Sequence, residues 1–201
     1  MCGRMIPGNS YMTYAMSDTD GTPRVPKILG ARTIAESRYF SIEELDLEFS
    51  NGQRRTYERI PARGYPAVIV VAVNADRELM LIREYAAGFH EIQLTLPKGA
   101  ADRGETLVQA ADRELKEEIG FGARRIRELK HLNLAPGHMG FTIHAMLAED
   151  LYPERLPGDE PEPIELVPWP LARFDELLAS DSFCEARAIA ALCLARPFLG
   201  C

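Results

Sequence analysis

Three glutamates within one short segment have the residue type and the spacing of a metal site. Glu114, Glu117 and Glu118 are related as i, i+3 and i+4, so on a helix they share one face. Like charges in this arrangement repel one another unless a cation lies between them. Mg²⁺ prefers hard oxygen ligands and commonly bridges protein carboxylates to substrate phosphates. The spacing therefore favours a reaction at phosphorus with Mg²⁺ as cofactor and Mn²⁺ as an alternative ion.

A helix with clear ends is predicted around these glutamates. Thr106 and Gln109 form a capping box at its start, and Gly120 marks its end. Glu114 and Glu118 lie on or beside the apolar arc of the helical wheel, where solvation alone does not explain a carboxylate. That arc, which we expect to face the core, consists of Leu107, Val108, Ala111, Leu115 and Ile119. A charge run of this kind is also common on solvated helix faces, so the helix alone leaves both interpretations open.

Strands and further helices surround this helix in the predicted fold. Apolar patterns predict strands at residues 67–73, 78–85, 93–97, 126–135 and 141–151, and helices at 171–179 and 185–195. Prolines make 149–170 mostly loop, with at most a short strand at 164–167 before Trp169. Because strands and helices interleave without regular βαβ spacing, we expect an α/β fold, a mixed sheet with helices packed on it.

The amino-terminal segment has a different composition from the rest. Residues 1–27 are rich in Gly, Ser, Thr, Asp and Pro without an apolar period. They are therefore predicted to be a flexible tail, with Met16 as an alternative start of the natural chain.

A small antiparallel β-appendage is predicted at residues 28–62, before a main domain at 63–201. The pattern becomes strand-like from Ala31, and Asn51-Gly52 supplies a hairpin turn between strands at 45–49 and 53–60. An appendage of this size is too small to be stable alone and exposes strand edges. We therefore expect it to hold a homodimer together.

Composition and charge limit the partners of the chain. Its 201 residues carry 23 Lys and Arg against 30 Asp and Glu, a net charge of −7, so it has no basic field for nucleic acid or an anionic membrane. The longest apolar run, residues 68–73, is far shorter than the roughly 20 residues that span a bilayer. The first residues also lack the apolar segment of a signal peptide. We expect a cytoplasmic protein that binds a small molecule and neither nucleic acid nor membrane.

The three glutamates belong to a longer pattern. Gly99 is followed after five residues by Glu105, then after seven by Arg113-Glu114-Leu115, and then by Glu117-Glu118 and Gly120-Phe121. These residues match the Nudix box at every defining position, and the chain resembles the Nudix hydrolase family from about residue 28 to 198. The resemblance implies an α/β/α sandwich in which the box forms a loop, a helix and a loop.

An activity and a set of site residues follow from this resemblance. Similar Nudix hydrolases use Mg²⁺ or a related ion, commonly as homodimers, to cleave the pyrophosphate of ADP-ribose, diadenosine polyphosphates and NADH. The products are AMP and a second phosphorylated compound. By position, the metal set is Gly99, Glu114, Glu117 and Glu118. Arg113 joins the three glutamates in the catalytic set, and Glu105 supports Arg113.

Two positions outside the box resemble substrate contacts of this family. Pro136, fifteen residues after Phe121, matches the downstream proline of ADP-ribose pyrophosphatases. Arg83, in the segment LIREY, precedes a loop as the phosphate-contacting arginine of similar proteins does. A pairing of Arg83 with Glu84 on a surface strand is an equal alternative.

The amino-terminal hairpin and the loop at 136–142 supply further candidates. Arg54, Arg55 and Tyr57 could reach a nucleotide, although an ordinary exposed strand face is slightly favoured for them. The loop at 136–142 contains no acid where ADP-ribose pyrophosphatases usually have a glutamate. His138 is therefore the candidate general base from this loop.

Three other functions are alternatives to hydrolysis of ADP compounds. A nucleotide-sugar pyrophosphatase would share the chemistry, because the box determines the reaction and the surrounding loops determine the leaving group. A non-catalytic sensor of ADP-ribose is disfavoured, because all the metal-site glutamates are present. A purely structural dimer would leave the glutamates beside the apolar arc unexplained.

Overall fold

The computed structural model describes residues 23–62, 64–158 and 160–200, and divides the chain into two units between Ile60 and Pro61. The predicted tail therefore lies outside the described residues up to position 22, as does Met16. Strand β1 begins at Lys27, four residues before the strand-like pattern that was expected from Ala31.

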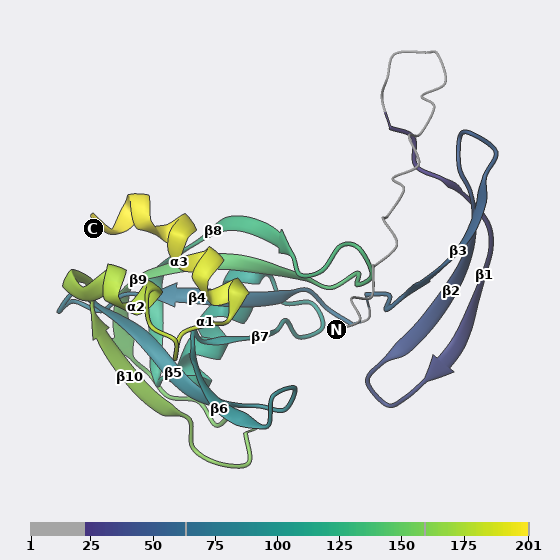
Figure 1. Cartoon of the computed structure of the whole chain (residues 1–201). Helices are drawn as coiled ribbons and strands as arrows, with labels where there is room; N and C mark the ends of the chain where they lie inside the picture. The colour runs from purple at the N-terminus through teal and green to yellow at the C-terminus, as the bar shows by residue number, and fades with distance from the viewer. Residues whose placement is uncertain (1–22, 63, 159, 201) are drawn as a thin grey trace, which may run out of the picture. The chain divides into compact units, whose positions relative to one another are not determined.

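The amino-terminal unit is an antiparallel sheet of three strands (Figure 1). Strands β1 (Lys27–Glu36), β2 (Ser41–Glu48) and β3 (Arg54–Arg59) pair in that order. The predicted turn at Asn51-Gly52 joins β2 to β3, with a φ of 77° at Gly52 that glycine adopts without strain. The expected antiparallel appendage is thus confirmed, with β1 as an additional strand.

Two sheets form the second unit. Strands β7, β4, β9 and β8 make a mixed sheet in which β4 and β9 are parallel, while β10, β5 and β6 make an antiparallel one. Their bounds are β4 (Ala67–Ala72), β5 (Glu78–Ala86), β6 (Glu91–Thr95), β7 (Lys98–Ala100), β8 (Phe121–Asn133), β9 (Thr142–Pro153) and β10 (Glu165–Pro170). The predicted mixed sheet is confirmed.

Helices cover both sides of these sheets, which gives the predicted α/β/α layers (Figure 1). The helices are α1 (Leu107–Glu118), the short 3₁₀ helix η1 (Leu171–Arg173), α2 (Phe174–Leu178) and α3 (Ala186–Leu199). Side chains of β4 alternate between the two layers: Val68 and Val70 pack in the cluster under α1, and Ile69 and Val71 pack in the cluster under α2 and α3. A strand buried on both faces explains the continuous apolar run in the sequence.

Several element boundaries differ from the prediction. Strand β9 extends two residues beyond the predicted 151, to Pro153, and β10 includes Pro168 and Pro170, both expected in a loop. The order β10-β5-β6 makes β10 an edge strand, where proline is tolerated because one side of the strand donates no ladder hydrogen bonds. Strand β8 also starts at Phe121, five residues before the predicted 126.

Two helix predictions also need correction. Val108, expected on the buried arc of α1, is instead 46% exposed. Helix α3 continues beyond the predicted 195 and through Pro197, because Leu199 still packs in the core. Within the described ranges, no helix is long and apolar enough to cross a membrane.

Candidate active site

Helix α1 begins as the sequence predicts. The hydroxyl of Thr106 accepts a hydrogen bond from the Gln109 backbone N–H at 3.2 Å, and the Gln109 side chain accepts one from the Thr106 N–H at 2.9 Å. These two bonds satisfy free donors of the first turn. Leu115 is fully buried against the sheet. The cap and the apolar face therefore fix both the start and the rotation of the helix.

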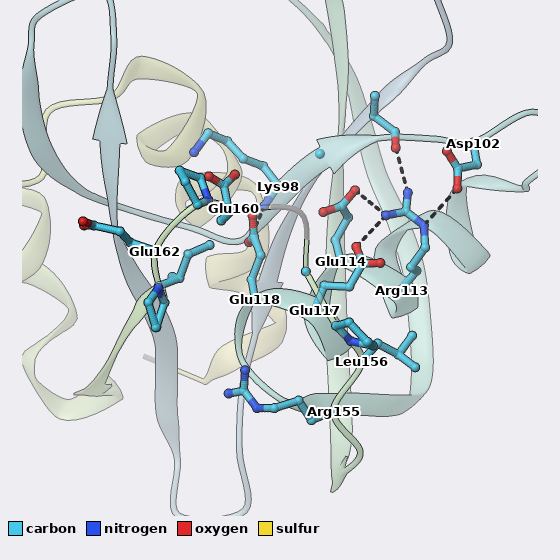
Figure 2. A pocket seen from close by; sticks show the side chains of 17 residues that line it. Lys98, Asp102, Arg113, Glu114, Glu117, Glu118, Arg155, Leu156, Glu160 and Glu162 are labelled. Carbon is cyan, nitrogen blue, oxygen red and sulfur yellow. Dashed lines mark hydrogen bonds and ion pairs between the residues drawn. The ribbon is translucent and has the colours of Figure 1, made fainter.

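That rotation turns the glutamates into a cleft. Glu114 and Glu118 are each only 8% exposed, while Glu117 is half-buried. All three line a cleft of about 850 Å³ that is bounded by β7, by α1 and by the segment after β9 (Figure 2). The structure therefore brings the predicted glutamates together in one concave site.

Arg113 ties the acidic residues of the site together (Figure 2). Its Nη1 donates to Glu114 Oε1 at 2.9 Å and to Glu117 Oε2 at 2.8 Å. Its Nε and Nη2 donate to both carboxylate oxygens of Glu105, and Nη2 also donates to the Ala100 carbonyl. The bond from Arg113 holds the pKa of Glu105 below its usual range, and Glu105 in turn raises the pKa of the guanidinium. Arg113 is thus a permanent cation that orients two of the glutamates.

Gly99 is in direct contact with one of these carboxylates. A Cβ atom on residue 99 would overlap the carboxylate of Glu114, well inside van der Waals contact. Only glycine leaves space for Glu114 at this point of β7. Gly99 is therefore needed for steric reasons beside Glu114, and its place in the metal set stays a prediction.

Glu118 is as buried in the cleft as Glu114. Its Oε2 accepts the backbone N–H of Lys98 at 3.1 Å. Burial raises the pKa of Glu118 to about 9, and the nearby charge of Glu114 contributes in the same direction. The Lys98 ammonium pairs with Glu84 and lies 4.0 Å from Glu185 Oε2. Lys98 thus connects Glu118 to β5 and to the start of α3.

The donor set of this cleft fits a hard divalent cation. Carboxylates of Glu114, Glu117 and Glu118 line one space, and the two buried ones, Glu114 and Glu118, interact electrostatically with each other. Across the described parts of the chain, no three acidic, histidine or cysteine side chains form a ready-made metal cluster. Instead, Arg113 lies between Glu114 and Glu117 and partly neutralises them.

The opposite wall of the cleft is the proline-rich segment after β9, which the sequence predicts to be mostly loop. The Glu154 N–H donates to the Gly120 carbonyl, and the Leu156 N–H donates to the Lys116 carbonyl, both at 3.1 Å. Lys116 also pairs with Glu154 at 2.8 Å. Arg155, within this anchor, lines the cleft together with Glu160 and Glu162, which follow it (Figure 2). The sequence signal was acidic and basic residues in a proline-rich loop, a pattern that many loops share.

The predicted site residues outside the Nudix box are not among the residues that line the cleft. Arg83 pairs at 3.5 Å with Glu165 of β10, and not with Glu84 as the alternative had it, because neighbouring residues of a strand point to opposite faces. Pro136 and His138 are exposed in the turn between β8 and β9, and neither is among the residues that line the cleft.

The other candidates lie on β3 of the amino-terminal unit. Arg54 pairs with Glu48 at 2.9 Å, and Arg55 donates to the Gln53 side chain at 2.9 Å. Tyr57 is 47% exposed and lies against Phe49, with 6.2 Å between ring centroids. All three are side chains of an exposed strand, and their role in substrate binding stays a prediction.

Comparison with known proteins identifies the family. Residues 65–190 match the NUDIX domain, and residues 26–59 match the NudE-type Nudix hydrolase N-terminal domain. The chain belongs to the Nudix hydrolase family. The family resemblance and the enzymatic class inferred from the box are therefore confirmed.

Relatives of this Nudix hydrolase cover most of its length. The ADP compounds hydrolase NudE of Escherichia coli K12 is 49% identical over 174 residues, which cover 87% of this chain and 93% of that protein. An ADP-ribose pyrophosphatase of Bacillus subtilis is 29% identical over 70% of this chain and 79% of its own. A crystal structure of an ADP compounds hydrolase superposes with a TM-score of 0.85 at 47% identity, covering 89% of this chain and 96% of that one. The predicted Nudix fold is confirmed.

Proposed function

We propose that the chain is a Mg²⁺-dependent hydrolase that cleaves the pyrophosphate of ADP-containing nucleotides, with ADP-ribose as a principal substrate and diadenosine polyphosphates and NADH as further ones. The observation that supports this most is the complete set of glutamates on α1, turned into one cleft and oriented by Arg113. The names of the ADP compounds hydrolase and the ADP-ribose pyrophosphatase among its relatives support the substrate class.

Each residue of the cleft has a definite task in this proposal. Glu114, Glu117 and Glu118, with the backbone at Gly99, would hold the metal, which when bound would polarise a phosphoryl oxygen and lower the pKa of a water. Arg113 fixes the directions of Glu114 and Glu117 through its Nη1. The Lys98 N–H fixes Glu118. The chain therefore supplies a preorganised acidic wall, so the carboxylates need little reorientation during the reaction.

Hydrolysis breaks the anhydride bond between two phosphorus atoms. The oxygen of water joins one phosphorus, and the bridging oxygen leaves with the other phosphate. ADP-ribose would thus give AMP and ribose 5-phosphate. The proton of water needs an acceptor, and Glu160 and Glu162 are carboxylates of the facing wall that Arg113 does not bind. We propose that this pair, and not His138 in its exposed turn, accepts it.

A product-resolved turnover assay with Mg²⁺ tests the function. ADP-ribose, diadenosine triphosphate, NADH and GDP-mannose are offered in parallel to the parent protein. We expect metal-dependent release of AMP from the adenine substrates. Glu118→Gln should lose this activity, whereas Asp181→Asn, which removes an exposed carboxylate outside the cleft, should retain it. Tight binding of ADP-ribose without turnover would reject the hydrolase and favour a sensor.

The proposed proton acceptor is tested in the same assay. The double variant Glu160→Gln, Glu162→Gln should lower kcat by roughly 100- to 10,000-fold, the usual contribution of a general base. If kcat is unchanged in this double variant and His138→Gln is inactive, His138 is the proton acceptor instead.

A nucleotide-sugar substrate is the second candidate. A GDP-mannose pyrophosphatase of Salmonella paratyphi B is 25% identical to this chain over 168 residues, which cover 78% of this chain and 87% of that protein. Release of GMP from GDP-mannose, without AMP from ADP-ribose, would favour this alternative.

A further inference from the structure

Three cationic side chains line the cleft, and two of them have anionic partners. Arg113 donates to Glu105, Glu114 and Glu117. The ammonium of Lys98 pairs with Glu84. The third, Arg155, is exposed to solvent and forms no hydrogen bond or ion pair with the described residues. One guanidinium in this acidic cleft is therefore available to an anion from outside.

The position of Arg155 is set by the backbone on both sides of it. The Glu154 N–H is bound to the Gly120 carbonyl and the Leu156 N–H to the Lys116 carbonyl, so the segment is fastened to the carboxyl end of α1. The guanidinium itself lies over Gly120, where a Cβ atom would be 2.9 Å from both Nε and Nη2 of Arg155. The missing side chain at Gly120 thus leaves the space that Arg155 occupies.

A guanidinium in this position can bind a phosphate group that enters the cleft. Glu114, Glu117 and Glu118 approach the cleft from α1, while Arg155 approaches it from the segment fastened beyond the carboxyl end of that helix (Figure 2). A polyphosphate lying in the cleft would have one end at the carboxylates and another within reach of Arg155. Guanidinium groups bind phosphate oxygens in pairs, with planar geometry that an ammonium lacks.

We propose that Arg155 is a substrate-binding residue that pairs with non-bridging phosphate oxygens of the pyrophosphate substrate. This inference rests on the proposed function, because it names the residue that binds the substrate anion in the same cleft. Arg155 acts on binding and not on bond cleavage. Its removal should therefore raise KM and leave kcat close to that of the parent.

Calorimetric binding to the full chain in EDTA gives a readout that needs neither metal nor turnover. The probes are ADP-ribose, inorganic pyrophosphate and adenosine, which has no phosphate. Arg155→Gln should weaken the binding of ADP-ribose and of pyrophosphate by roughly 10- to 100-fold, as expected for the loss of a charged hydrogen-bond pair. The affinity for adenosine should stay unchanged. Arg155→Lys should recover part of the loss. Arg125→Gln, which removes the same charge from an exposed position of β8 outside the cleft, should behave as the parent.

The outcomes separate this inference from the function on which it rests. Steady-state turnover is measured on the same variants with Mg²⁺. If the parent hydrolyses ADP-ribose and Arg155→Gln has the same KM and the same metal-free affinity, the inference about Arg155 is overturned while the proposed function stands. Equal losses in Arg155→Gln and Arg125→Gln would also overturn it, because general charge would then explain the effect. A parent that hydrolyses none of the nucleotides would reject the proposed function, while pyrophosphate binding would still test Arg155.

Discussion

At the scale of single residues, the site depends on very close packing between a glycine and a glutamate. Gly99 has no side chain, and the carboxylate of Glu114 occupies the space where one would be. Gly99→Ala should displace this carboxylate from Arg113 and lower kcat/KM roughly 100-fold, since small misplacements at a reacting centre have effects of that order. Turnover and thermal unfolding are measured together. Gly137→Ala is the matched control, because a Cβ there meets nothing within 4 Å. Activity retained in Gly99→Ala would contradict the steric role.

The ion pair of Glu105 with Arg113 should make the free energy of unfolding depend on pH in the acid range. Its hydrogen bonds with Arg113 hold its pKa below the ordinary 4.5, so the ionised form stabilises the folded state above that pH. This contribution is lost as the pH falls through the lower folded pKa. Glu105→Gln lacks it at every pH. The difference in free energy of unfolding between parent and variant should therefore be largest at neutral pH and shrink below 4.5. Urea unfolding of parent and variant at neutral pH and below pH 4.5 measures this difference in free energy. A difference that is the same at both pH values would contradict this account.

At the scale of elements, helix α1 owes its start to a local pair of side chains. Thr106→Ala removes the hydroxyl that accepts the Gln109 N–H, and should lower the free energy of unfolding by about 1 kcal/mol. Thr106→Ser keeps the hydroxyl and serves as control. Denaturant midpoints at neutral pH report the difference. Equal losses in the two variants would show that the methyl group, and not the cap, is responsible.

Elements that depend on local interactions could be predicted from the sequence, whereas those that depend on distant parts of the chain could not. Helix α1, its cap and the burial of Glu114 and Glu118 follow from residues within one segment, and the structure confirms them. Strand β10 depends on pairing with β5, far away in the chain, so its two prolines suggested a loop. The residues of the facing wall, Arg155 among them, enter the cleft because their segment is fastened to the end of α1. No pattern within residues 154–164 indicates that attachment.

At the scale of the whole molecule, the amino-terminal sheet exposes several large apolar side chains to solvent. Among its large exposed side chains are Ile28 at 54%, Leu29 at 43% and Ile34 at 44%. We propose that a second copy of the chain covers this surface, so that the protein is a homodimer. Sedimentation equilibrium should give twice the 22.5 kDa of one chain. The variant Leu29→Ser, Ile34→Ser should shift the equilibrium toward monomer, and a parent that is monomeric at micromolar concentration would contradict the proposal.

The alternation of β4 has a consequence for how the second unit unfolds. Each of its neighbouring side chains belongs to a different layer, Val70 under α1 and Val71 under α3. Neither layer can open fully without exposing half of this strand, so the two should melt in a single cooperative transition. Amide hydrogens of β4 should then exchange with solvent only through global unfolding. Helix α1 packs on one face of this strand, so full opening of its layer should belong to the same global transition.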